Sequence, residues 1–199
     1  MLAKINLVVF DFDGTLSAYD ANMKFGKYCF KHSVRPWLFL PVISVAAIGR
    51  LFNPGGVWWR QTMRSFLTKD MVKKLAPGFI CEHKMERFGW AAEQVAAERA
   101  VGNKVILISA GPDYLIPFLV DDIKFDGVVC SVMNKNKPWK YEFFCWGKYK
   151  VQAMDEWARK NRYLPRLKKS YSDSRTDMPL MELACRQVWI NPKTGMRKN

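Results

Sequence analysis

Apolar residues occur along the chain as short unbroken runs separated by longer mixed stretches. Residues 5–10 are nearly all branched or aromatic, residues 104–109 form a second apolar run, and further short strands are predicted at residues 127–132, 167–172 and 187–191. Runs of this length without alternation predict strands buried on both faces of a parallel sheet. The stretches between them favour helices, so we expect the α/β class with a doubly wound, Rossmann-like parallel sheet.

The mixed stretches contain the expected helices. Helices are predicted at residues 57–66, 69–75, 82–101, 112–120, 151–160 and 179–185. Pro77 and Gly78 predict a break after the second of these, because proline removes a helix donor. Gly102 and Asn103 are typical of a helix C-terminus. Residues 140–146 alternate enough to be a strand or a hairpin arm.

Two carboxylates, Asp11 and Asp13, follow the first apolar run directly. Residues two apart on an extended segment point the same way, and ligands of parallel sheets bind at the carboxyl ends of the strands. Neighbouring carboxylates repel unless a cation lies between them or one is protonated. Mg²⁺ is the hard cation that suits such oxygen ligands. Gly14 allows the chain to turn out, and Thr15 offers a hydroxyl to an anion.

The most apolar stretch, residues 36–49, lies between Arg35 and Arg50. It is too short to span a bilayer as a helix, which needs about 20 residues, and Pro41 would kink or split it. Two interpretations remain open: an interfacial element that contacts a membrane, and an internal helix of a small bundle. Residues 21–79 hold ten lysine or arginine residues against one acid, Asp70. Together with tryptophans suited to an interface, this basic excess favours membrane contact.

The overall composition sets the broad class. The 199 residues are 49% hydrophobic and 25% charged, which is typical of one globular core with a modest insertion. The five cysteines are odd in number and form no C-x-x-C pair, which indicates reduced thiols and a cytoplasmic location. The first strand begins at once, so no cleavable signal peptide is expected. The net charge of +14 suggests a nucleic-acid-binding protein as a remote alternative, but no such motif is visible and we expect no nucleic-acid partner.

The stretch Asp11-Phe12-Asp13-Gly14-Thr15 resembles the first motif of the haloacid dehalogenase superfamily. Three further places match the later motifs of that family in its order: a serine that ends a strand (Ser109), a lysine before a helix (Lys148 or Lys150) and an acidic pair after a strand (Asp173 and Asp177). The set extends over almost the whole chain. The resemblance implies a catalytic core at residues 1–18 and 90–199, with a helical cap inserted at residues 19–89.

The resemblance also implies a phosphatase that works through an aspartyl phosphate. Asp11 would be the nucleophile, and Asp13 would be the general acid and base. Mg²⁺ would be held by Asp11, the backbone carbonyl of Asp13 and Asp173, while Asp177 orders the site or a metal-bound water. An aspartate at the position of Asp13 is typical of the phosphatases of the superfamily, and its dehalogenases lack it.

The remaining site residues would contact the substrate. Ser109, with backbone amides near Ala110 and Gly111, would bind the phosphoryl oxygens, and a lysine would neutralise their charge. Lys150 is favoured over Lys148 because it stands directly before the helical stretch. For Ser109 and Asp177 the alternatives are a hydroxyl that bonds to the backbone and a helix N-cap. Further substrate contacts are expected from Thr15, Asp20, Arg60 and Arg64, although Asp20 is equally suited to capping a helix.

The insertion resembles, in its position directly after the first motif and in its helical character, the cap of the phosphoserine-phosphatase-like branch of the superfamily. Within it, the apolar stretch, residues 171–180 and the ending 188–192 resemble the phosphatidylglycerophosphate phosphatases of bacterial inner membranes. This implies removal of the terminal phosphate of phosphatidylglycerophosphate by a cytoplasmic protein held on the inner face of the membrane. An anionic lipid head group and an anionic membrane surface would be its partners. The alternative is a phosphatase of a small metabolite such as phosphoserine or another amino-alcohol phosphate.

Overall fold

The computed structural model describes residues 2–53 and 56–198. Its sheet consists of strands β1 (Ala3–Phe10), β2 (Lys104–Pro112), β3 (Gly127–Met133), β4 (Tyr141–Phe143), β5 (Tyr163–Ser172) and β6 (Arg186–Trp189). The α-helices are α1 (Ala21–His32), α2 (Arg35–Leu38), α3 (Leu40–Phe52), α4 (Val57–Thr62), α5 (Lys69–His83), α6 (Trp90–Ala100), α7 (Ile116–Leu119), α8 (Tyr149–Lys160) and α9 (Met178–Met181). A 3₁₀ turn at Arg175–Asp177 leads into α9.

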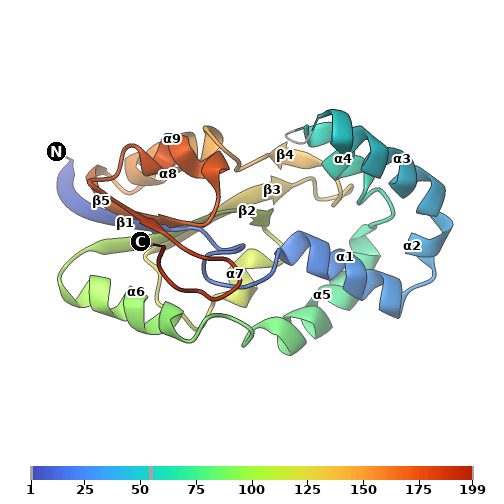
Figure 1. The fold of residues 1–199 in the computed structure, drawn as a ribbon, viewed down its shortest axis with the longest axis horizontal. Helices are drawn as coiled ribbons and strands as arrows, with labels where there is room; N and C mark the ends of the chain where they lie inside the picture. Colours follow the sequence, from blue (N-terminus) through green and yellow to red (C-terminus); the bar gives the residue numbers. More distant parts are fainter. Residues whose placement is uncertain (1, 54–55, 199) are drawn as a thin grey trace.

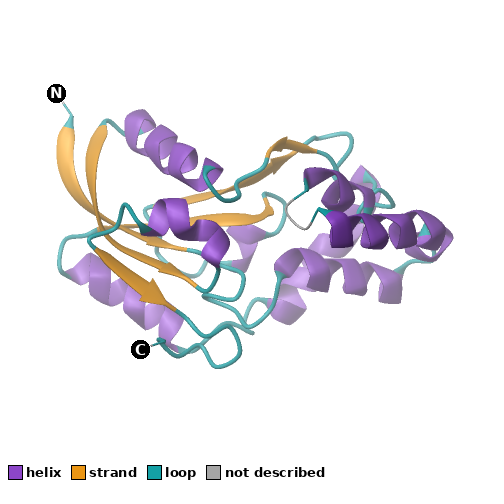
Figure 2. Cartoon of the chain, turned by 45° about the horizontal axis from the view of Figure 1, so that its top comes forward, coloured by secondary structure: helices purple, strands orange, loops and turns teal. Residues whose placement is uncertain are grey.

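The six strands form one sheet in the order β4-β3-β2-β1-β5-β6. All neighbouring pairs are parallel except β3 and β4. Helices cover both faces of the sheet (Figures 1 and 2), with α8 and α9 on one side and α6 and α7 on the other. The predicted doubly wound α/β fold is therefore confirmed.

The buried faces of the central strands explain this arrangement. Successive residues of a strand point to opposite faces, and β1 has apolar side chains at both. Leu7 and Val9 belong to the cluster under α8, while Val8 and Phe10 belong to the cluster on the opposite face. All four are at most 1% exposed. A strand buried on both sides explains why the sequence of β1 shows no alternation.

The order of the strands places the predicted motifs side by side. β1 lies in the middle of the sheet and pairs in parallel with β2 and β5. Because parallel strands end at the same edge, the residues after β1 and β5 and those near the end of β2 come together there. Asp11, Ser109 and Asp173 come from these three places.

Five of the six helix predictions were wrong at their boundaries. The helices predicted at 57–66 and 179–185 end early, at Thr62 and Met181. Helix α5 continues through Pro77, because Leu75, Ala76 and Phe79 are buried around the proline. Residues 84–89 form a turn rather than the start of the helix predicted at 82–101, because Arg87 bonds both carboxylate oxygens of Asp122 at 2.7 and 2.6 Å. Strand β2 extends to Pro112, so the helix predicted at 112–120 is reduced to α7.

Helices α1 to α5 lie together beyond the carboxyl end of the sheet (Figure 1). We interpret residues 19–89, which contain them, as the cap of the core. The apolar stretch at 36–49 divides at Phe39 into α2 and α3, and Pro41 lies in the first turn of α3, where no amide hydrogen is needed. At Gly49, a Cβ atom would lie 2.5 Å from the Trp58 ring, so only glycine allows α3 and α4 to approach so closely.

The cap exposes a large set of apolar side chains. Only Ala46 of α3 is buried, so α3 is not the internal helix that the sequence left open. We define the exposed apolar set as the large side chains of α2 to α4 that are at least 57% exposed, namely Trp37, Leu38, Val45, Ile48, Leu51, Phe52 and Trp58. Soluble surfaces rarely expose so many large apolar side chains on consecutive elements.

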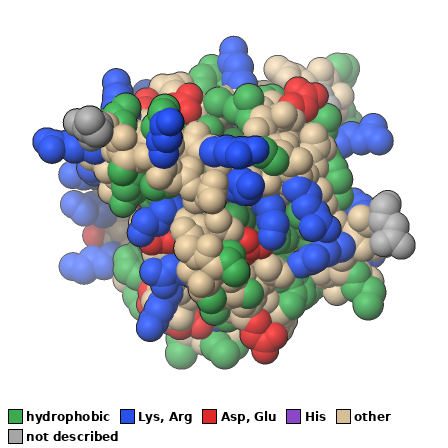
Figure 3. Space-filling model, turned by 90° about the vertical axis from the view of Figure 1, so that its left-hand side faces the viewer, with side chains coloured by type: hydrophobic (Ala, Val, Ile, Leu, Met, Phe, Trp, Pro, Cys, Tyr) green, Lys and Arg blue, Asp and Glu red, His purple; other side chains and the backbone are tan. Residues whose placement is uncertain are grey.

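Basic side chains are not confined to the cap. Lysine and arginine side chains also cover the end of the molecule opposite the cap (Figure 3), so the basic excess of the cap does not by itself mark a binding surface. Of the helices among the described residues, none has the length and hydrophobicity to cross a bilayer. The thiols of the described cysteines are free, with Cys29, Cys130 and Cys145 buried.

Candidate active site

The end of β1 presents two carboxylates in different surroundings. Asp11 is only 8% exposed, and Asp13 accepts a hydrogen bond of 2.7 Å from the backbone amide of Ala21 at the start of α1. Gly14, between them and Thr15, has a φ of +72°, and a Cβ there would lie 2.4 Å from Asp173 Oδ2. The turn after β1 therefore needs glycine, both for its backbone conformation and to let Asp173 come close.

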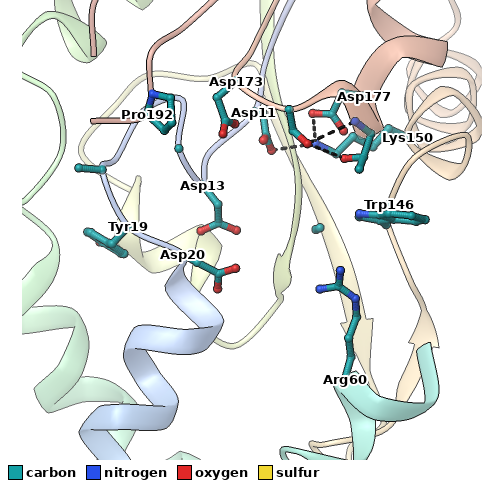
Figure 4. Close-up of a pocket in the computed structure, with 15 residues that line it drawn as sticks. Asp11, Asp13, Tyr19, Asp20, Arg60, Trp146, Lys150, Asp173, Asp177 and Pro192 are labelled. Atoms are coloured by element: carbon teal, nitrogen blue, oxygen red, sulfur yellow. Dashed lines mark hydrogen bonds and ion pairs between the residues drawn. The ribbon is translucent and has the colours of Figure 1, made fainter. Parts of the chain in front are cut away.

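Lys150 bridges two of the predicted acidic residues (Figure 4). Its Nζ donates to Asp11 Oδ1 and to Asp177 Oδ2, each at 2.8 Å. The Ser172 hydroxyl also donates to Asp177 Oδ2, at 2.7 Å. Lys148 instead precedes α8 at its N-cap position, with an exposed side chain. The structure thus brings Lys150, and not Lys148, to the acidic residues.

Burial changes the proton affinity of these groups. Desolvation raises the pKa of Asp11 to about 7, against the attraction of Lys150. The pKa of Asp13 is also raised well above its usual range, first by desolvation and then by the negative charges of Asp20 and Asp11. Desolvation alone would lower the pKa of Lys150, but Asp11 and Asp177 raise it, so the ammonium stays charged. A carboxyl group with a raised pKa is suited to donating a proton.

Thr15 and Asp173 hold each other in place across the turn. The Thr15 hydroxyl donates to Asp173 Oδ1 at 3.2 Å, and the Asp173 amide donates back to Thr15 Oγ1 at 3.0 Å. Thr15 is fully buried and does not line the cavity described below. The structure therefore places Thr15 as a support of Asp173 rather than in direct contact with the cavity.

The acidic residues can supply oxygen ligands to a metal. Asp11, Asp13, Asp173 and Asp177 line one cavity of about 370 Å³, and Asp177 Oδ1 is buried without a hydrogen-bond partner. No three acidic, histidine or cysteine side chains of the described residues converge tightly enough to hold a metal by themselves. The predicted set needs only two carboxylates, because the third protein ligand is the Asp13 carbonyl and waters complete an octahedral Mg²⁺ site. The donors present fit such an ion.

The segment Ser109-Ala110-Gly111, near the end of β2, lies mostly beneath the cavity. Ser109 is fully buried, and its Oγ accepts a hydrogen bond of 3.0 Å from the Gly111 amide. Of this segment only Ala110 lines the cavity. Ser109 therefore makes the hydrogen bond to the backbone that the sequence allowed. Contact of its hydroxyl with a substrate stays a prediction.

Asp20 and Asp177 occupy the helix-capping positions that the sequence allowed. Asp20 caps α1 by accepting from the Met23 amide at 2.8 Å, and it also lines the cavity. Asp177 precedes α9, but its side chain makes no capping bond and instead binds Lys150 and Ser172. Asp20 can therefore face a substrate while it caps α1. The Asp177 side chain is instead held by its bonds to Lys150 and Ser172.

Residues from three distant segments complete the cavity walls. Arg60 reaches it from α4, and Tyr19 and Trp146 lie on opposite sides (Figure 4). Arg64 lies farther away and lines a neighbouring cavity. Five further wall residues were not predicted from the sequence as site residues, namely Tyr19, Trp146, Ser174, Thr176 and Pro192. Three of them could have been identified from the sequence. Ser174 and Thr176 lie between the two acids Asp173 and Asp177, and Trp146 directly precedes Gly147 and Lys148.

The fold and the site together define a class of α/β proteins that hold reactive carboxylates at the carboxyl ends of parallel strands. The family model of haloacid dehalogenase-like hydrolases matches residues 8–182. The chain belongs to this family. The sequence-based resemblance to the family is thereby confirmed, while the resemblance to phosphatidylglycerophosphate phosphatases stays a prediction.

Other proteins are similar to this chain in sequence or in fold. A probable phosphatase of Mycobacterium tuberculosis is 29% identical over 126 residues, which are 56% of this chain and 40% of that protein. A protein of unknown function from Bordetella pertussis Tohama I shares the fold with a TM-score of 0.78 at 16% identity, over 98% of this chain and 93% of that one. A phospho-aspartyl intermediate analogue of phosphoserine phosphatase has a TM-score of 0.64 at 15% identity, over 94% and 87% of the two chains.

Proposed function

We propose that this chain is a magnesium-dependent phosphomonoester hydrolase that forms an aspartyl phosphate. The observation that carries the proposal is the pairing of buried Asp11 with Lys150 at 2.8 Å, in a cavity that Asp13 and Asp173 also line. Lys150 holds one oxygen of Asp11, which leaves the second oxygen to react. The ion pair counteracts the desolvation that would otherwise favour the protonated, unreactive acid.

The steps follow from the positions of the side chains. The free oxygen of Asp11 attacks phosphorus and forms an acyl phosphate, and the bond from phosphorus to the ester oxygen breaks. Asp13 gives its proton to that leaving oxygen, as its raised pKa favours. Asp13 then accepts a proton from water, which attacks phosphorus and releases phosphate and the Asp11 carboxylate. Lys150 neutralises negative charge throughout.

Asp11, the Asp13 carbonyl and Asp173 would hold Mg²⁺ beside the phosphoryl group. When bound, the ion supplies positive charge that polarises the phosphoryl oxygens. The contacts between Asp173 and Thr15 support this role, because they fix the direction of the carboxylate.

We further propose phosphatidylglycerophosphate as the substrate, reached at an anionic membrane surface. The exposed apolar set of α2 to α4 supports this, because side chains such as Leu51 and Phe52, at 78% and 85% exposure, gain free energy on leaving water. Arg35 and Arg50 flank the apolar stretch 36–49, which holds much of the set, and each basic residue near such a surface contributes about 1 kcal/mol. The protein would then be cytoplasmic and peripheral on the inner face of the membrane.

A phosphatase of phosphoserine or a related amino-alcohol phosphate is the second candidate. The shared fold with phosphoserine phosphatase and the presence of Asp20 in the cavity wall favour it, because a carboxylate can bind an ammonium group. Among the described residues of the cap, Asp20 is the acid that lines this cavity. The two candidates share one chemistry and differ in what the cap recognises.

The test is phosphate release in the presence of Mg²⁺ or of EDTA. Phosphatidylglycerophosphate in mixed micelles, phosphoserine and a chromogenic aryl phosphate are compared by kcat/KM. We expect Mg²⁺-dependent turnover with the lipid preferred by orders of magnitude. A preference for phosphoserine would replace the lipid proposal with the second candidate, and no release from any ester would contradict the phosphatase itself.

A further inference from the structure

A second, larger cavity adjoins the candidate active site. It has a volume of about 670 Å³ and shares Asp20, Arg60, Trp146 and Thr176 with the wall of the first cavity. Its other walls are largely apolar and include Phe30, Ile43, Trp59, Met63 and Phe66. A substrate whose phosphate lies near Asp11 can therefore extend into a space formed mainly by the cap.

The charged side chains of this second cavity are unbalanced. Lys27, Arg50, Arg60 and Arg64 line it, against one acid, Asp20. None of these four cations lies within 4.0 Å of a carboxylate of the described residues. Lys27 and Arg50 are exposed, whereas Arg60 is half-buried and Arg64 is buried. Because buried charges are normally paired, Arg60 and Arg64 point to an anion that is not part of the chain.

Arg64 is the most buried of the four cations. It is 8% exposed, its Nε donates to the Arg60 carbonyl at 3.1 Å, and its Nη1 donates to Asn22 Oδ1 at 2.7 Å. Its Nη2 is buried without a hydrogen-bond partner, as is Nε of Arg60. Both guanidinium groups thus keep a donor for which the described protein atoms offer no acceptor.

Aromatic rings hold the two guanidinium groups in position. The Arg60 guanidinium lies 4.5 Å from the centre of the Trp59 ring and 5.8 Å from that of Trp146. The Arg64 guanidinium lies 4.6 Å from the centre of the Tyr141 ring. Rings attract a cation over their faces but do not satisfy its N–H groups. Such stacking orients the guanidinium and leaves its edge available to bind an anion.

From this geometry we infer that Arg60 and Arg64 form a subsite for a second anionic group of the substrate, next to a cavity that receives an attached apolar group. The inference rests on the phosphatase function proposed above and specifies its substrate class: a phosphomonoester that carries another phosphate or a carboxylate. Arg60 reaches toward the acidic cavity (Figure 4), so it lies between the reacting phosphate and the second anion. Desolvation lowers the pKa of Arg60, which a bound anion would counteract.

The competing explanation is that the two arginines only fasten the cap to the core. Tyr141 and Trp146 belong to the core, so the stacking does connect the two parts. A fastening role would affect every substrate alike. An anion subsite would affect only substrates with a second negative charge, and this difference can be measured.

The experiment assays four proteins, each with four soluble or dispersed substrates. The proteins are wild type, Arg60→Gln, Arg64→Gln and Arg64→Lys. Glycerophosphoglycerol phosphate has a second phosphate but no acyl chain, phosphatidylglycerophosphate adds the chains, phosphoserine has a carboxylate, and an aryl phosphate has no second anion. The readout is kcat/KM for each substrate divided by kcat/KM for the aryl phosphate. Lys69→Gln, at an exposed cap residue outside both cavities, is the control for overall charge.

We expect both glutamine variants to lower the ratio for glycerophosphoglycerol phosphate by about 30-fold or more, with partial recovery in Arg64→Lys and no change in Lys69→Gln. A ratio that falls only for phosphoserine supports the subsite and identifies its anion as a carboxylate. Ratios within twofold of wild type for all substrates overturn the inference. A higher ratio for the acylated than for the deacylated substrate in wild type supports the apolar part, and equal ratios overturn it.

A binding measurement separates failure of the subsite from failure of the phosphatase proposal. Glycerophosphoglycerol carries the phosphodiester alone and needs no turnover, so calorimetric titration reports on the subsite even in an inactive protein. We expect binding to wild type and at least tenfold weaker binding to Arg64→Gln. Equal binding to both proteins, with unchanged circular dichroism, overturns the role of Arg64. An absence of phosphate release from every ester counts against the proposed function only.

Discussion

Replacing Lys150 by methionine removes the charge that joins the two buried acids of the site. The side chain is 2% exposed, and its Nζ lies 2.8 Å from both Asp11 Oδ1 and Asp177 Oδ2. Methionine keeps most of the apolar stem, so the change leaves little cavity. What it leaves is two carboxylates, 8% and 2% exposed, without their shared cation.

The magnitude follows from the cost of an unpaired buried charge. Removing one partner of a buried ion pair destabilises a protein by about 3–5 kcal/mol, which is a large part of the typical total of about 5–15 kcal/mol. We therefore expect Lys150→Met to fold but to unfold at markedly lower urea concentration. Turnover should be lost as well, since Asp11 then favours its protonated form.

The loss should also depend on pH, in a direction that the structure sets. Burial raises the pKa of Asp11 to about 7 even with Lys150 present, and the variant loses the main group that lowers it. Because the folded pKa lies above the unfolded one, near 4, the folded variant keeps a proton that the unfolded chain releases. Its stability then falls as pH rises through the folded pKa, by up to about 1.4 kcal/mol per pH unit for one proton.

The assay is urea unfolding in EDTA at pH 7 and at pH 9, for wild type, Lys150→Met and the matched variant Lys148→Met. Lys148 is exposed, so its replacement should change the free energy of unfolding by less than about 0.5 kcal/mol. The penalty of Lys150→Met should be larger at pH 9 than at pH 7. A penalty below 1 kcal/mol, or one that is equal at both pH values, would refute the electrostatic argument.

Three other changes test the site and the cap. Asp11→Asn should keep the circular dichroism spectrum and lower kcat by more than about 10³-fold; substantial remaining turnover would exclude Asp11 as nucleophile. Saturating Mg²⁺ should stabilise wild type by about 2.7 kcal/mol at a hundred times Kd, seen as a rise in Tm, and Asp173→Asn should abolish most of that rise; an undiminished rise would remove Asp173 from the ligand set. Replacing Ile48 and Leu51, 57% and 78% exposed, together by glutamine should weaken binding to anionic vesicles about tenfold or more in a sedimentation assay while the aryl phosphatase rate stays constant; undiminished sedimentation would argue against membrane contact through α3.

The chemistry at the end of β1 could be predicted from the sequence because it depends on residues that are neighbours in the chain. An apolar run that ends in Asp11 and Asp13 predicts a buried strand whose end carries both carboxylates. Parallel pairing then brings Asp173 to the same edge, whichever helices intervene, since all parallel strands end there. The α/β class and the acidic site follow from these local patterns.

Tertiary structure alone decided the features that depend on contacts between distant segments. Lys150 rather than Lys148 meets the acids because α8 packs against β2, β3 and β5. Two residues, about half a helical turn, separate the buried Lys150 from the exposed Lys148. The chain leaves the helix after His83 because Arg87 meets Asp122, a partner that no local pattern indicates.

The cap shows the same division between local and distant determinants. The sequence predicts its helical character and shows its apolar stretch, but apolar residues are equally compatible with a buried helix and an exposed one. Only the packing of α3 through Gly49 against Trp58 turns Ile48 and Leu51 outward. Likewise, the sequence identifies Arg60 and Arg64 as basic, while their burial against aromatic rings of the core comes from folding, because burial depends on which surfaces meet.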